Sequence, residues 1–218
     1  MKSLLFGSLC CIFFLTGCVS VKPKGIKPSI ENQINHKTNP ILFVNSLFKA
    51  TLEIKKRRLS GLLLIKRMDT AAEGISSKGS VYRVVFTNEI GMTFFDLELT
   101  SDSGKMISCF ASFNKKAFIK ILKTDFQVLT NNFQFESQRT YRQDSTRNLI
   151  IYGIAGSMKI WQVYSPTADT LFKVAGKSTI ADPVFISFTN YSNNRPAKIT
   201  VENPVIGMKL SLRLLSKP

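Results

Sequence analysis

Most of the chain alternates between apolar and polar residues with the period of two that is typical of β-strands. In the clearest run Phe95, Leu97 and Leu99 share one face, and Asp96 and Glu98 share the other. One face is therefore expected to be buried and the other to contact water. Short runs of this kind, separated by Gly, Pro, Asn and Ser, predict strands at 43–54, 59–68, 81–87, 92–100, 105–111, 149–155, 158–164, 170–175, 184–190, 197–202 and 208–215.

The period changes once, near the middle of the chain. Asn114 is a candidate N-cap, and apolar residues then recur at helical spacing as far as Asn131. We expect this helix to pack on the sheet; the alternative is a free amphipathic helix that binds a membrane. The polar segment 133–148 predicts a loop with a short strand.

Strands at this spacing around one helix predict a mainly β (α+β) fold. We expect a strongly curved antiparallel sheet of about eleven strands that forms a half-open barrel, lidded by one or two helices. The sheet occupies one domain, residues 41–218, which is long enough to bury a sizeable core.

The first residues have the layout of a secretory signal peptide: Lys2, an apolar run of about a dozen residues, and small residues before a cysteine. This run is too short to span a membrane. The motif Leu15, Thr16, Gly17, Cys18 resembles the lipobox of bacterial lipoproteins. The resemblance implies that residues 1–17 are removed and that Cys18 is acylated; the alternative is an ordinary signal peptide.

Residues 18–40 are rich in Lys, Pro, Gly, Asn and Ser and predict a flexible tether between the acylated cysteine and the domain. In some envelope lipoproteins an acidic run after the acylated cysteine resembles a surface-export signal. No such run follows Cys18. We therefore expect an outer-membrane protein that is lipid-anchored and faces the periplasm.

The formal net charge of +16 indicates attraction to an anionic surface. For an exported protein, nucleic acid is not the expected partner; an anionic lipid surface, lipopolysaccharide or an acidic protein is. The alternative is that Lys and Arg only keep the strand surfaces soluble.

Little in the sequence points to catalysis, a metal or a cofactor. If Cys18 is acylated and Cys10 and Cys11 leave with the signal, Cys109 has no disulfide partner, and it is expected to be a buried thiol. His36 is the only histidine and stands in the tether. Asp96 and Glu98 could be imagined as an acid pair but are more simply solvent-facing. We therefore expect that the protein is not an enzyme and that it binds neither a metal nor a cofactor.

The run Thr87, Asn88, Glu89, Ile90, Gly91 between two alternating strands resembles the hairpin of the LolB family of outer-membrane lipoprotein receptors, in which a leucine projects from the turn. The following strand, the helix, and the closing pair 196–201 and 207–212 occur in the family's order. The resemblance implies a half-open barrel with an apolar cavity. It also implies a monomer that accepts lipoprotein acyl chains from a periplasmic LolA-like carrier and delivers them to the membrane.

By this resemblance Ile90, with Met92 beside it, would form a tip that inserts into the membrane. If the concave face follows the alternation, the cavity is lined by Tyr82, Val84, Phe86, Phe95, Leu97, Leu99, Phe118 and Leu122. A carrier of this kind should then have an open apolar cavity of several hundred cubic ångströms, and a solid core there would contradict the carrier hypothesis. The other hypothesis is a structural or interaction lipoprotein with a filled core, whose basic surface docks an envelope partner.

Overall fold

In the computed structural model, the described residues are 26–27, 41, 43–68, 80–101, 103–143, 145–167, 169–178, 183–192 and 195–215. They form one continuous antiparallel sheet and a single α-helix. The elements are β1 (Ile26–Lys27), β2 (Asn45–Ile54), β3 (Arg57–Met68), β4 (Val81–Thr87), β5 (Thr93–Leu99), β6 (Gly104–Cys109), the 3-10 turn η2 (Ala111–Phe113), α1 (Lys116–Thr130), β7 (Ser137–Gln143), β8 (Leu149–Ala155), β9 (Met158–Tyr164), β10 (Leu171–Ser178), β11 (Val184–Ser192), β12 (Arg195–Asn203) and β13 (Met208–Leu214).

The strand order in the sheet is β1-β7-β8-β9-β10-β11-β12-β13-β2-β3-β4-β5-β6. Strands β2 to β6 pair in chain order, as do strands β7 to β13; the last strand, β13, also pairs with β2 near the start of the domain, and the short β1 pairs with β7. This pairing joins the two halves into one sheet. The sheet is not closed, because β6 and the β1/β7 end have no strand beyond them in the described structure.

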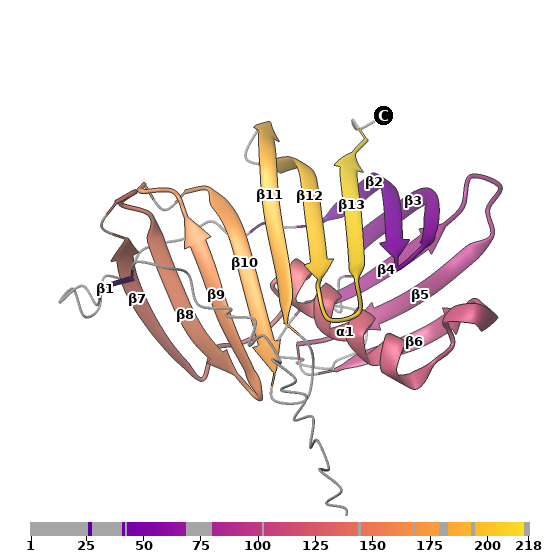
Figure 1. Cartoon of the computed structure of the whole chain (residues 1–218), viewed down its shortest axis with the longest axis horizontal. Coiled ribbons are helices and arrows are strands. Elements are labelled where there is room, and N and C mark those ends of the chain that lie inside the picture. The colour runs from indigo at the N-terminus through magenta and orange to yellow at the C-terminus, as the bar shows by residue number, and fades with distance from the viewer. Residues whose placement is uncertain are drawn as a thin grey trace, which may run out of the picture.

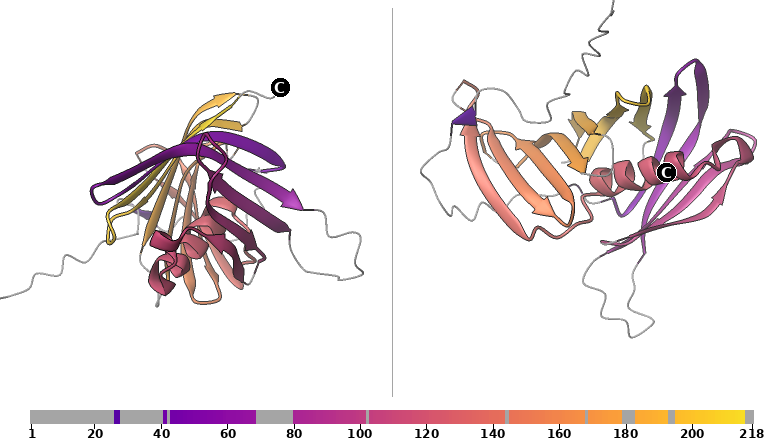
Figure 2. Two further views of the ribbon diagram at one scale, coloured as in Figure 1. Left: turned by 90° about the vertical axis from the view of Figure 1, so that its right-hand side faces the viewer. Right: turned by 60° about the horizontal axis from the view of Figure 1, so that its bottom comes forward.

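The sheet curves strongly, and α1 lies inside the curve (Figures 1 and 2). Side chains alternate as the sequence predicts: in β2, Phe48, Ala50 and Leu52 are buried, whereas Lys49 and Glu53 are exposed. The concave face therefore carries the apolar core, and most of the convex face contacts solvent. The prediction that Asp96 faces solvent is wrong: it is 8% exposed, and its carboxylate accepts hydrogen bonds of 3.0 and 2.7 Å from Arg83 on the neighbouring strand. The predicted class, a mainly β half-open barrel with a helical lid, is confirmed.

The helix begins one residue later than predicted. Asn114 is not the N-cap; Lys115 occupies that position without a side-chain hydrogen bond. The end is where the sequence places it, at Asn131, which adopts the left-handed conformation (φ 53°) and donates its backbone N–H to the Gln127 and Val128 carbonyls. Helix α1 packs mainly against β5, β6, β10 and β11, and so bridges the two halves of the sheet.

Candidate functional site

The strand residues predicted to line the cavity lie together on the concave face of β4 and β5. They form three cross-strand pairs, Tyr82 with Leu99, Val84 with Leu97, and Phe86 with Phe95. All six are buried in the core. Burial also raises the pKa of the Tyr82 hydroxyl, since a phenolate would be poorly solvated there. The sequence thus predicted which residues share this apolar face; their contact with acyl chains stays a prediction.

Helix α1 covers this face from the other side. Leu122 is buried and Phe118 is partly buried against the core. Phe126 packs on Phe95 with their ring centroids 5.6 Å apart, and Phe95 packs on Phe86 at the same distance. Each buried apolar side chain of α1 contributes about 1.5–3 kcal/mol to docking.

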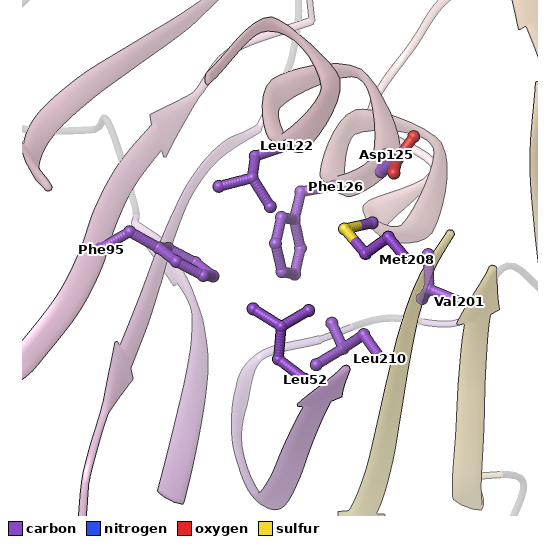
Figure 3. Close-up of a pocket in the computed structure, with 8 residues that line it drawn as sticks. All are labelled: Leu52, Phe95, Leu122, Asp125, Phe126, Val201, Met208 and Leu210. Atoms are coloured by element: carbon purple, nitrogen blue, oxygen red, sulfur yellow. The ribbon is translucent and has the colours of Figure 1, made fainter. Parts of the chain in front are cut away.

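The space left between α1 and the sheet is small. Leu52 from β2, Met208 and Leu210 from β13, and Phe126 from α1 converge on it (Figure 3). Its volume is about 10 Å³, roughly that of one water molecule. The lining is apolar except for Asp125 on α1. The expected open apolar cavity is therefore not found in this space between α1 and the sheet, because the apolar stripe of α1 fills it.

Two strand glycines allow α1 to approach the sheet this closely. A Cβ added at Gly176 in β10 would lie 2.9 Å from Cγ2 of Val128, and one at Gly104 in β6 would lie 3.1 Å from Cγ of Lys123. Such distances are shorter than van der Waals contact. Glycine within a strand often marks the close approach of another segment, and this signal in the sequence was missed.

A larger groove of about 500 Å³ lies beside α1, near the β8–β9 turn and the end of β10. Sequence reasoning did not anticipate it. Within it, Glu136 Oε1 accepts the Gly156 backbone N–H at 3.0 Å, and the hydroxyls of Ser157 and Ser178 lie 3.1 Å apart. Its lining mixes polar with apolar side chains: Ser101, Lys120, Thr124, Gln127, Phe133, Gln134, Glu136, Ala155, Gly156, Ser157, Met158 and Ser178. This mixture suits an acyl chain less well than the concave face does.

The β4–β5 hairpin presents the predicted tip to solvent. Ile90 is 90% exposed and Met92 is 41% exposed. The turn is held by Asn88, whose Oδ1 accepts the backbone N–H groups of Ile90 at 3.1 Å and Met92 at 2.8 Å. Gly91 supplies the positive φ of 86° that the turn requires. An aliphatic side chain is thus projected from an ordered turn, as the resemblance implied, although its insertion into a membrane is untested.

Other chemistry in the described part of the chain is sparse. Cys109 is a free, half-buried thiol, and burial raises its pKa, which lowers the fraction of reactive thiolate. The described residues contain no cluster of three or more His, Cys, Asp or Glu side chains suited to a metal ion. No described helix combines the length and the apolar character needed to cross a membrane. The predicted signal peptide, the lipobox Leu15 to Gly17, Cys18 and all of the tether except β1 lie outside the described residues.

No protein-family model matches the chain, and a comparison with curated proteins finds no match. Among solved structures, a DUF1329 family protein from Desulfovibrio piger is similar with a TM-score of 0.52 and 11% identity, over 79% of this chain and 84% of that one. A domain described as an outer membrane lipoprotein-sorting protein, from Vibrio parahaemolyticus, has a TM-score of 0.45 and 11% identity, over 80% and 84% of the two chains. At this identity the first similarity supports the fold alone.

Proposed function

We propose that this chain is a membrane-anchored lipoprotein of the bacterial envelope that takes up lipoprotein acyl chains on its concave apolar face and passes them to the outer membrane. The observation that carries the proposal is an open, curved sheet whose apolar face is covered by one helix, α1. Acylated Cys18 would hold the domain at the periplasmic side of that membrane. A soluble LolA-like carrier would supply the cargo, and the domain would act as a monomer without catalysis.

Uptake requires α1 to move, because the space beneath it is only about 10 Å³. Undocking α1 exposes four buried apolar side chains, Leu122, Phe126, Val128 and Leu129. At about 1.5–3 kcal/mol each, their exposure costs roughly 6–12 kcal/mol. An acyl chain gains about 0.8 kcal/mol per buried CH₂, so about a dozen CH₂ groups return roughly 10 kcal/mol. An acyl chain can therefore replace the contacts that the helix gives up.

Delivery would use the hairpin tip. Ile90 is the most exposed large apolar residue described, and it would enter the bilayer while cargo leaves the concave face. The neighbouring Glu89 stays at the head-group level in this arrangement. Insertion of one aliphatic side chain contributes about 1.5–3 kcal/mol, enough to change a transfer rate by roughly tenfold or more.

The test is Ile90→Glu in the mature chain, with transfer of a bound lipoprotein to liposomes as the readout. Val205→Glu is the matched control, because Val205 is also exposed, at 57%, but lies on the β12–β13 turn. We expect the rate to fall about tenfold or more for Ile90→Glu and to change little for Val205→Glu. Equal rates in the two variants would remove the tip from the mechanism.

The filled core favours a second candidate, a structural or interaction lipoprotein whose basic surface docks an envelope partner. In that case α1 stays docked and the concave face binds nothing. Mass spectrometry of lipids extracted from the purified protein, together with titration by a fluorescent acyl probe, separates the two. Saturable binding of one probe per chain supports the carrier; no binding at any probe concentration supports the second candidate.

A further inference from the structure

Three cationic side chains stand side by side across the convex face of the sheet. Lys198 on β12 is directly opposite Arg213 on β13, and Arg213 is directly opposite Lys49 on β2. All three are exposed. Because neighbouring strands are about 4.8 Å apart, the three residues start within about 10 Å of one another. Like charges directly opposite each other destabilise a sheet, so this basic row opposes folding.

The same three strands show that opposite charges could have been placed there. Four residues along each strand, Lys209 stands between Glu202 and Glu53, and Glu53 faces Arg58 on β3. The Lys209 Nζ lies 3.0 Å from Glu202 Oε1, and Arg58 Nε lies 3.7 Å from Glu53 Oε1. This second row alternates in sign and is internally neutralised.

By contrast, no member of the basic row forms a salt bridge with any residue that the structure describes. Its charges are left for an anion from outside the chain. The row between the two supplies hydroxyl groups, with Thr200, Ser211 and Thr51 directly opposite one another. Hydroxyl and cationic donors together suit phosphate oxygens.

Leu62 and Thr87 continue the basic row toward the hairpin tip. Lys49 is opposite Leu62 on β3, and Leu62 is opposite Thr87, the last residue of β4 before the turn that carries Ile90. Beside the row, Leu47 is 40% exposed on the convex face. A line of cations with exposed aliphatic side chains nearby, Leu47 beside it and Ile90 in the turn, is the pattern of a surface that meets lipid head groups with its charges and the acyl region with its apolar side chains.

We propose that Lys198, Arg213 and Lys49 form a docking site for the phosphate groups of anionic lipids. The site would hold the convex side of β12, β13 and β2 against the membrane, with the Ile90 hairpin at the same end of the sheet. This surface does not depend on what the concave face carries, so it goes beyond the proposed transfer of acyl chains.

The experiment measures binding of the mature, unacylated chain (residues 18–218 with Cys18→Ser) to empty vesicles of phosphatidylcholine containing a minor share of phosphatidylglycerol. All described elements lie within this chain. The test variant combines Lys198→Gln, Arg213→Gln and Lys49→Gln. The control combines Lys159→Gln, Lys173→Gln and Lys177→Gln, three exposed lysines on β9 and β10 that include a directly opposed pair.

At about fivefold per charge, the test variant should lose about a hundredfold in vesicle affinity, and the control much less. The melting temperature of the test variant should not fall, because the substitutions relieve the repulsion between like charges. Unchanged vesicle binding would overturn the proposal and leave an acidic protein as the partner of the row. A loss no larger than the control's would also overturn it, since total charge alone would then account for binding. The vesicles carry no lipoprotein, so failure of the acyl-transfer proposal does not affect the result.

Discussion

Phe126→Ala tests whether α1 is a lid or a fixed part of the core. Phe126 is buried between α1 and the sheet, where its ring packs on Phe95 and the free space is about 10 Å³. Removing the ring costs about 3–5 kcal/mol, which at about 2–4 °C per kcal/mol lowers the melting temperature by roughly 6–20 °C. Most of this loss is docking energy of α1, so undocking becomes easier by a similar amount.

If acyl chains bind only when α1 has undocked, their apparent affinity contains the cost of undocking. Phe126→Ala should therefore bind a fluorescent acyl probe at least about tenfold more tightly, although the protein is less stable, since about 1.4 kcal/mol corresponds to tenfold. Phe48→Ala is the control. Phe48 lies on β2, away from α1; it is as buried as Phe126, and its ring centroid is 6.2 Å from that of Phe43. If Phe126→Ala loses stability without binding the probe more tightly, or if Phe48→Ala gains as much probe affinity, the hypothesis that α1 is a lid is refuted.

Two further substitutions test the fold and the anchor. Gly61→Ala should lower the free energy of unfolding, measured by urea denaturation, by about 3 kcal/mol. The reason is that the new Cβ would lie 1.9 Å from the Thr87 carbonyl oxygen of β4. The control Ser60→Ala, on the other face of the strand, should change the free energy of unfolding little. Cys18→Ala should abolish incorporation of labelled palmitate, whereas Cys109→Ala should keep it; labelling that survives Cys18→Ala would show that the lipobox is not used.

The strands could be predicted because the alternation of apolar and polar residues within each strand shows which of its side chains are buried. In β5, Leu97 and Leu99 alternate with Asp96 and Glu98, and this period-two pattern can be read without knowing what covers the apolar face. The stripe on α1 is readable for the same reason. The two-residue strand β1, which pairs with Arg142 and Gln143 of β7, is too short to have such a signal.

Two features depend on contacts between distant parts of the chain and were not predictable. The degree of cavity filling depends on how closely α1 approaches the sheet at Gly176 and Gly104; the two glycines signal a close approach, but the sequence does not say which segment approaches. The basic row is invisible in the sequence for a similar reason. Lys49 meets Arg213 only because β2 pairs with β13, and a shift of one residue would turn Lys49 to the other face.

The ends of α1 differ in a way that indicates how a lid would open. Its N-terminus has no side-chain cap and no acid in the first turn, and Lys115 and Lys116 stand where the helix dipole disfavours cations. Its C-terminus carries most of the buried residues, and Asn131 Oδ1 accepts a hydrogen bond of 2.6 Å from Gln162 on β9.

A helix of 15 residues is marginal alone, so its N-terminal half depends on docking for its structure. That half carries Phe118, which is only partly buried against the core. Undocking of α1 should therefore start at its N-terminal half, with the helix pivoting about its C-terminal end at Asn131. This motion would expose the concave face first on the side of β5 and β6. An acyl chain entering by this route meets Leu97 and Leu99, the residues whose alternation first indicated an apolar face.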